Sequence, residues 1–288
     1  MKGLGTAIIT PFKSDGSVHY EALARLLDTQ LTGFVDYIVV LGTTDEAATM
    51  TADEKREVRQ FIVKYVNGRL PLVLGVGGNS TAAVIADLKA MRNELILDYS
   101  AILSVGPYYN KPNQEGLFQH FCAVAEASPV PVILYNVPGR TGVNLLPETV
   151  MRIWAAHPDK IIGIKEASGN LDQIKHLIDL AKGKLMVISG DDGIACEVME
   201  AGGAGLISVA SNAFAEDFHD IVHKKDQDKQ VQYAEMIRLL FAEGNPVGIK
   251  AVLAQKGLIQ NYLRLPLVPA SVSLCELLSN VVRARKCA

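Results

Sequence analysis

A lysine that ends an apolar run points most directly to chemistry in this sequence. Lys165 follows the segment Ile161 to Ile164, so its amine is expected inside the protein. A buried lysine pairs with an acid, extends its ammonium to solvent or serves as a desolvated amine. Burial disfavours the ammonium, and a neutral amine can attack a carbonyl and form a Schiff base. Because successive side chains of a strand face opposite sides, we do not expect Glu166 to pair with Lys165.

Four more polar side chains follow similar apolar runs, and each has two interpretations. The hydroxyl of Tyr135 can relay protons, but packing alone also explains a tyrosine at a strand end. Thr43 and Thr44 can bind a small carboxylate, or they are ordinary β-branched residues at the end of a strand. Arg140 offers a bidentate fork for a carboxylate, or it is a solvated surface residue. Their convergence at one face favours the functional interpretation of all of them.

Eight short apolar runs alternate with amphipathic helical patterns and predict the elements that position these residues. The expected strands are Gly5 to Pro11, Tyr37 to Gly42, Leu72 to Val76, Ala101 to Val105, Pro131 to Tyr135, Ile161 to Lys165, Met186 to Ser189 and Gly205 to Val209. Such strands are typical of a parallel sheet buried on both faces. Eight units predict an α/β fold of the closed (β/α)8 type, a TIM barrel with its site at the C-terminal strand ends. An open doubly wound sheet has the same pattern up to the sixth strand.

The pattern changes after Asn212, where helical periods continue without a further strong strand. Proline and glycine punctuation divides this part into roughly three helices. We therefore predict a barrel over residues 1–213, which carries the active site, and a C-terminal helical appendage over residues 214–288.

The composition favours a small-molecule enzyme. The chain has 288 residues, 49% of them hydrophobic, so it can bury a large core and is not a disordered chain. A net charge of -3 lacks the basic excess that attracts nucleic acid or anionic membranes. The four cysteines are far apart and have no metal-ligand spacing, which predicts a reduced, cytoplasmic protein without a metal. No export signal is recognised, and the apolar runs are shorter than a membrane span of about 20 residues.

Six segments, in order along almost the whole chain, resemble the dihydrodipicolinate synthase family of pyruvate-dependent class I aldolases. They are GTAIITPF at 5–12, GTTDEA at 42–47, PYYNKP at 107–112, YNVPGRTG at 135–142, GIKEA at 163–167 and GDD at 190–192. The resemblance implies that Lys165 forms an imine with pyruvate and that no other cofactor takes part. The enamine of pyruvate would then attack L-aspartate 4-semialdehyde, a step of lysine and diaminopimelate biosynthesis.

The same resemblance implies roles for further residues. A proton relay would consist of Tyr135, Thr43 and Tyr109, with Tyr109 supplied by a neighbouring subunit of a homotetramer built from two tight dimers. Arg140 would bind the carboxylate of the semialdehyde, and Thr44 would help to hold the carboxylate of pyruvate. The remaining pocket positions implied by the family are the backbones of Gly190 and Ile207.

The sequence departs from the family at positions that bear on geometry and regulation. Asp45 stands where the family usually has glycine, so a left-handed backbone there would be strained. Lysine-inhibited members carry His, His and Glu where this chain has Ala52, Lys55 and Ala83. Ala83 removes an acidic side chain that could pair with the ammonium of free lysine, and Lys55 adds a positive charge that repels it. We therefore expect feedback inhibition to be weak or absent.

Two alternatives remain open from the sequence. An N-acetylneuraminate lyase or a 2-keto-3-deoxy sugar acid aldolase would keep Lys165 and Tyr135 but accept a sugar aldehyde. Arg140 argues against that alternative. A barrel that only binds a ligand is the other, and the intact set of Lys165, Tyr135 and Thr43 argues against it.

Overall fold

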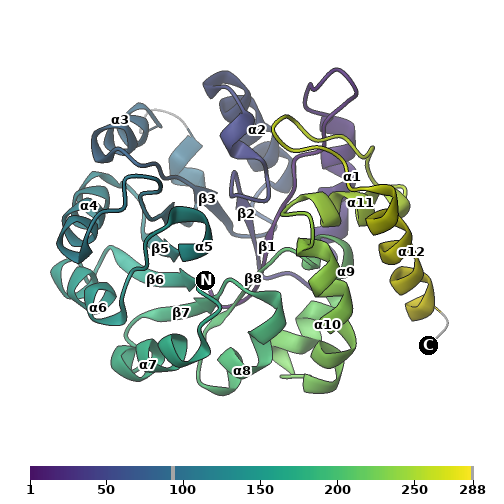
Figure 1. The fold of residues 1–288 in the computed structure, drawn as a ribbon. Coiled ribbons are helices and arrows are strands. Elements are labelled where there is room, and N and C mark those ends of the chain that lie inside the picture. The colour runs from purple at the N-terminus through teal and green to yellow at the C-terminus, as the bar shows by residue number, and fades with distance from the viewer. Residues whose placement is uncertain (92–94, 287–288) are drawn as a thin grey trace.

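The computed structural model describes residues 1–91 and 95–286 and contains the predicted TIM barrel (Figure 1). Eight parallel strands form a closed barrel in chain order, and β1 closes the ring by pairing with β8. The strands are β1 (Gly3–Ala7), β2 (Tyr37–Val40), β3 (Leu72–Gly75), β4 (Ala101–Val105), β5 (Val132–Asn136), β6 (Ile161–Glu166), β7 (Met186–Ser189) and β8 (Gly205–Ser208). The closed ring excludes the open doubly wound sheet.

Helices surround the ring, as Figure 1 shows. They are α1 (Tyr20–Gln30), α2 (Ala52–Val66), α3 (Thr81–Met91), α4 (Gln114–Ala127), α5 (Pro138–Thr141), α6 (Pro147–Ala156), α7 (Leu171–Ala181), α8 (Ala195–Glu200), α9 (Ser211–His223), α10 (Gln227–Phe241), α11 (Val247–Gln255) and α12 (Val272–Lys286). The sequence explains where several of them begin. Thr51 and Glu54 form a reciprocal capping box at the start of α2, and Pro147 occupies the first turn of α6.

The first strand differs most from its predicted range, because β1 ends at Ala7 rather than Pro11. Beyond that point the side-chain amide of Asn212 forms hydrogen bonds with the backbone of the segment. Its Nδ2 donates to the Ala7 carbonyl at 2.8 Å, and its Oδ1 accepts from the Ile9 N–H at 3.2 Å. The Ile8 N–H still donates to the Val39 carbonyl of β2 at 3.1 Å, so the side chain of Asn212 replaces a strand as hydrogen-bond partner on one side of this segment only.

Two apolar clusters follow from the alternation of side chains along the strands. The inner cluster fills the barrel and includes Val39, Ile133 and Tyr135. The outer cluster lies between strands and helices and includes Ile38 and Leu134 from the same two strands. Alternation thus directs Tyr135 toward the barrel interior while its neighbour Leu134 packs under the helices.

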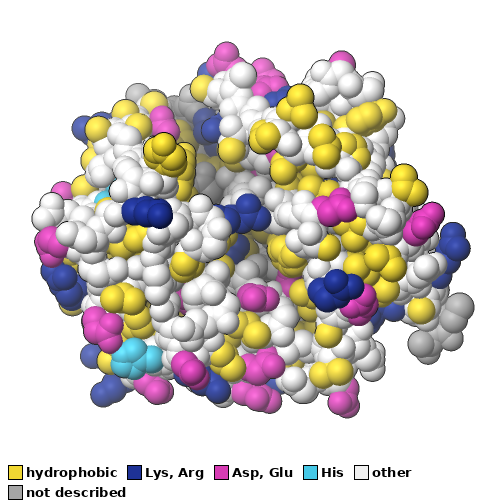
Figure 2. Space-filling model, viewed as in Figure 1, with side chains coloured by type: hydrophobic (Ala, Val, Ile, Leu, Met, Phe, Trp, Pro, Cys, Tyr) yellow, Lys and Arg dark blue, Asp and Glu magenta, His cyan; other side chains and the backbone are white. Residues whose placement is uncertain are grey.

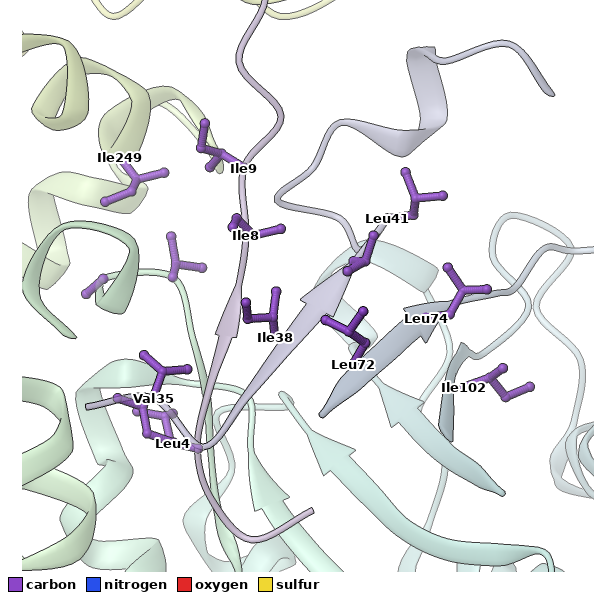
Figure 3. Packing of buried hydrophobic residues seen from close by; sticks show 14 of the residues in the cluster. Leu4, Ile8, Ile9, Val35, Ile38, Leu41, Leu72, Leu74, Ile102 and Ile249 are labelled. Carbon is purple, nitrogen blue, oxygen red and sulfur yellow. The ribbon is translucent and has the colours of Figure 1, made fainter. Parts of the chain in front are cut away.

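The C-terminal helices continue the barrel and then extend it. Helix α9 contacts β1, β8 and α1, and α10 and α11 pack against α9, while α12 packs against α10 and α11. The predicted division after residue 213 lies inside α9, and a division of the chain into two units stays a prediction. Figure 3 shows Ile249 of α11 facing the segment that carries Ile8 and Ile9, all members of the outer cluster.

Two further features of the described residues bear on the sequence predictions. Cys122, Cys196 and Cys275 are free thiols, while Cys287 lies outside the described residues. Within residues 1–91 and 95–286, no helix has the length and apolar character needed to span a membrane.

Candidate active site

A cavity of about 470 Å³ lies at the C-terminal ends of the strands. Figure 2 shows this face of the molecule hollowed near its centre, with Lys or Arg side chains in the hollow. The cavity is lined by Ala7, Val39, Gly42, Thr43, Thr44, Leu103, Tyr135, Val137, Gly139, Arg140, Lys165, Ala167, Ser168, Gly190, Asp191, Val209, Phe241 and Asn245. Six residues chosen from the sequence therefore line the same cavity: Thr43, Thr44, Tyr135, Arg140, Lys165 and Gly190.

Lys165 and Tyr135 lie directly beside each other in this cavity. They are register partners of β6 and β5, and Lys165 Nζ is 4.5 Å from the centroid of the Tyr135 ring. Both residues are only 7% exposed. Across the described residues, Lys165 has no ion pair and the hydroxyl of Tyr135 has no hydrogen bond, so both polar ends remain available to a ligand.

Gly190 leaves the space that the lysine occupies. A β-carbon at this position would lie 2.9 Å from Lys165 Cε and 2.6 Å from Ala167 Cβ. Both distances are shorter than side-chain contacts allow. The glycine after β7 lines the cavity and leaves room for the end of the lysine side chain, while its role in binding stays a prediction.

Glu166 faces away from the cavity and has a structural role. Its carboxylate is fully buried and accepts from Asn136 Nδ2 at 2.9 Å, from the Ser168 N–H at 2.7 Å and from Gln173 Nε2 at 3.2 Å. This network fixes the turn after β6. The expectation that Glu166 does not pair with Lys165 is confirmed.

The loop after β2 supplies Thr43 and Thr44. The Glu46 N–H donates to the Thr43 carbonyl at 3.2 Å and closes a tight turn. Thr43 is exposed in the cavity, whereas Thr44 is 3% exposed and its Oγ1 accepts from Asn245 Nδ2 at 3.0 Å. Left-handed φ values occur at Leu41 and Glu46 in this region and not at Asp45, so the strain considered at Asp45 does not arise.

Asp45 instead introduces a buried carboxyl group behind the two threonines. It is fully buried, and its Oδ1 accepts from Thr10 Oγ1 at 2.8 Å, while its Oδ2 has no partner within the described chain. Burial raises the pKa of Asp45 to about 7, against the opposing effects of Thr10 and, more weakly, of the charge on Lys250. Its protonation state therefore changes near neutral pH.

Arg140 lies on α5, the short helix that follows β5. Its N–H donates to the Val137 carbonyl at 2.9 Å, and its side chain is exposed and lines the cavity. A guanidinium at the entrance can bind a carboxylate through two parallel hydrogen bonds. This geometry favours the functional interpretation of Arg140 over that of a surface residue.

Two of the residues implied by the resemblance do not line this cavity. Tyr109 is 88% exposed, has a φ of 75° and donates its N–H to the Thr141 carbonyl at 3.2 Å. Ile207 is 1% exposed and belongs to the inner cluster of the barrel. Their roles in the site stay predictions.

Several lining residues were given no role by the sequence analysis. They are Val137, Gly139, Ala167, Ser168, Asp191, Phe241 and Asn245, among others. Position after a strand end was a usable signal for Ser168 and Asp191. Phe241 and Asn245 come from the C-terminal appendage, and the periodicity of that region gives no sign that it reaches the cavity.

A second cavity of about 590 Å³ adjoins the first. The residues common to both are Gly42, Thr43, Leu103, Tyr135, Val137 and Arg140. Ala52, Lys55 and Tyr108 also line it, so two of the positions that differ from lysine-inhibited members belong to this cavity. Lys55 adds positive charge to this cavity, and weak feedback inhibition by lysine stays a prediction.

Within residues 1–91 and 95–286, no group of three or more His, Cys, Asp and Glu side chains is placed to hold a metal ion. The chemistry that the described residues offer is that of an amine beside a phenol, two hydroxyls and a guanidinium. This set suits a Schiff base with an oxo acid.

Comparison with known proteins identifies relatives over almost the whole chain. The model of the dihydrodipicolinate synthetase family matches residues 1–285. A relative from Parabacteroides distasonis, named 4-hydroxy-tetrahydrodipicolinate synthase, is 48% identical over 98% of this chain and 96% of its own. One from Thermotoga neapolitana with the same name is 42% identical over 98% of both chains.

Solved structures are similar over the full length. Dihydrodipicolinate synthase from Thermotoga maritima superposes with a TM-score of 0.94 at 39% identity and covers 100% of this chain and 99% of its own. A structure described as the first monomeric dihydrodipicolinate synthase variant gives a TM-score of 0.93 at 40% identity, covering 98% of this chain and 96% of its own. The extent of these matches and of the family model shows that the chain belongs to the dihydrodipicolinate synthetase family.

Proposed function

We propose that the chain condenses pyruvate with L-aspartate 4-semialdehyde to give 4-hydroxy-tetrahydrodipicolinate, in lysine and diaminopimelate biosynthesis. The names of its relatives support this reaction. The observation that carries the proposal is the position of Lys165, whose amine lies in a cavity beside Tyr135 without an acidic partner in the described chain. Sugar acid aldolases are not favoured by the relatives found.

The first half-reaction makes the nucleophile. Lys165 Nζ attacks C2 of pyruvate, and the resulting carbinolamine loses water to form an imine. Loss of a proton from C3 converts the imine into an enamine. In this proposal Tyr135 moves these protons, and Thr43 and Thr44 offer hydroxyl and N–H groups to pyruvate; the support is that all three residues line the cavity.

The second half-reaction uses that enamine. Its C3 attacks the aldehyde carbon of the semialdehyde, and the oxygen takes up a proton as the carbon–carbon bond forms. The amino group from the semialdehyde then attacks the imine carbon, which closes the ring and returns Lys165 as a free amine. Arg140 binds the carboxylate of the semialdehyde at the entrance. No cofactor besides the covalent imine is proposed.

We also propose a homotetramer in the cytoplasm, with Tyr109 serving the site of a neighbouring subunit. The support is that Tyr108 and Tyr109 are 44% and 88% exposed in the single chain, a costly arrangement for two adjacent aromatic residues. A structural relative is described as a monomeric variant, so the family fold alone does not determine assembly.

The acceptor decides between this function and its alternatives. With pyruvate present, product should form from L-aspartate 4-semialdehyde at a far greater kcat/KM than from N-acetylmannosamine or a sugar aldehyde. The condensation product can be followed by mass spectrometry. Preference for a sugar aldehyde would favour the lyase alternative, and turnover of neither acceptor would favour a barrel that only binds.

A further inference from the structure

Three consecutive residues of the loop after β2 are each held by a different distant segment. Thr44 accepts from Asn245, Asp45 accepts from Thr10, and Glu46 forms an ion pair with Lys250 of α11. All three loop residues are at most 4% exposed. Two of these contacts come from the C-terminal appendage, although the loop carries the threonines of the cavity.

The hydrogen bond between Asn245 and Thr44 joins two residues that line the cavity. Asn245 is 8% exposed and donates from Nδ2 to Thr44 Oγ1 at 3.0 Å across 201 residues of sequence. A donated hydrogen bond fixes the rotamer of the threonine, and the hydroxyl proton of Thr44 stays free for a ligand. Asn245 thereby selects one orientation of Thr44.

The ion pair of Lys250 and Glu46 anchors the next turn of the same loop. Their side chains are 0% and 1% exposed, and the Arg264 N–H donates to Glu46 Oε2 at 3.0 Å. Lys250 Nζ also donates to the Tyr262 carbonyl at 3.1 Å and lies 4.2 Å from the centroid of the Phe12 ring. Neither partner of the pair lines the cavity.

A pair buried this deeply contributes more to geometry than to stability. Desolvation of two charges offsets most of their attraction, so such a pair adds little to the free energy of unfolding, whereas removal of one partner costs a great deal. One partner of the pair, Glu46, has a left-handed φ of 57°. This conformation is uncommon for a residue other than glycine, and contacts such as the ion pair hold it in place. The appendage therefore maintains a backbone that the loop would not adopt alone.

We propose that the C-terminal appendage is a positioning element for pyruvate, with Asn245 and Lys250 as positioning residues that hold the threonine loop in its binding geometry. The inference rests on the proposed function, since it requires that the loop receives the carboxylate of pyruvate. Figure 3 shows Ile249 of α11 facing the segment of Ile8 and Ile9 that follows β1, and the next residue of this helix, Lys250, forms the ion pair with the loop.

The test measures pyruvate binding separately from folding and from the second substrate. Full-length Asn245→Ala and the double variant Glu46→Gln/Lys250→Met are compared with the wild type. The double variant replaces the ion pair by two neutral side chains and avoids a lone buried charge. Gln230→Ala is the matched control, because this buried amide of α10 bonds to the Cys196 N–H and to Glu197 and not to the loop.

The readout is the pyruvate concentration that gives half-maximal adduct after borohydride reduction, together with the KM for the semialdehyde and the thermal midpoint. We expect this concentration to rise about threefold to tenfold in Asn245→Ala and in the double variant, the effect of one lost hydrogen bond. The KM of both variants for the semialdehyde should stay within about twofold of the wild-type KM. Gln230→Ala should keep the wild-type pyruvate response.

An unchanged pyruvate response in Asn245→Ala would overturn the inference, as would an equal shift in Gln230→Ala, which would indicate general loosening of the appendage. If the double variant does not fold, Asn245→Ala decides alone. A wild-type chain that forms no pyruvate adduct would contradict the proposed function and is thus distinguishable from failure of this inference.

Discussion

Lys165 Nζ lies 4.5 Å from the centre of the Tyr135 ring, and the two residues are direct register partners of neighbouring strands. The face of an aromatic ring attracts an ammonium group, so the tyrosine holds the end of the lysine at the cavity wall. The same contact keeps the phenol near the amine that must exchange protons during imine formation. Strand pairing thereby sets the geometry of the proposed catalytic pair before any substrate binds.

The guanidinium of Arg140 should matter for the second substrate more than for the first. Arg140→Ala is expected to lower kcat/KM for the semialdehyde by about tenfold to a hundredfold, the value of a charge-assisted contact of about 1.5–3 kcal/mol. Arg140→Lys keeps the charge but loses the fork and should be intermediate. Equal losses in the rate of pyruvate adduct formation and in semialdehyde use would show that Arg140 serves pyruvate or the fold.

Space beside the lysine should limit substitutions at Gly190. In Gly190→Ala the new methyl group would contact Lys165 Cε, so the lysine must move and adduct formation should slow by about tenfold to a hundredfold. Gly106→Ala is the control, because its β-carbon would lie no closer than 3.8 Å to any neighbour. Stopped reactions analysed by mass spectrometry give the two rates. Equal rates of adduct formation in both variants would contradict the close approach.

The carboxyl group of Asp45 should make stability depend on pH. Its pKa is raised to about 7 in the folded state by burial, so the folded protein keeps a proton that the unfolded chain loses near pH 4. The stability that this proton provides is complete below about pH 4 and is lost as the pH rises to about 7, by at most about 4 kcal/mol.

Asp45→Asn removes this dependence and keeps an oxygen for Thr10. The free energy of unfolding of the variant, relative to the wild type, should therefore increase between about pH 4 and pH 7 and stay constant above it. Urea titrations at several pH values measure the difference, and the buried Asp192, with a pKa raised to about 6, is common to both proteins. A difference that does not vary with pH would show that folding leaves the pKa of Asp45 unchanged.

Activity should depend on association if Tyr109 completes the site of a neighbour. Tyr109→Phe and Lys165→Ala are each expected to be inactive, and a mixture should recover part of the activity, because a mixed dimer holds one site with both groups. Native mass spectrometry can establish that the subunits have exchanged. No recovery after exchange would mean that Tyr109 acts within its own chain or not at all.

Local patterns were sufficient to predict the barrel and the position of Lys165 at the end of a strand. Short apolar runs marked all eight strands, and the alternation along β6 correctly separated Lys165 from Glu166, which is bonded to Asn136 and Gln173 on the other side. These features depend on neighbours in the sequence or on strand periodicity. They are therefore visible in a single chain without any knowledge of its packing.

Long-range contacts were not accessible in the same way. The bond between Asn245 and Thr44 joins residues 201 positions apart, and nothing in the period of a helix specifies which amide reaches which hydroxyl. The early end of β1 has the same origin, since the side chain of Asn212 replaces the neighbouring strand on one side of the segment that follows Ala7. Tertiary side-chain contacts determined both features and overrode the local pattern.

The identity of the reacting amine tests the central claim most directly. The wild type and Lys165→Ala are incubated with pyruvate, reduced with borohydride and digested, and the modified peptide is sequenced by mass spectrometry. We predict one reduced pyruvate adduct per wild-type chain, located at Lys165, and none in Lys165→Ala. The variant should fold, because Lys165 forms no ion pair with an acid among the described residues. An adduct that persists on another lysine of the variant, or a wild type that forms none, would contradict the account.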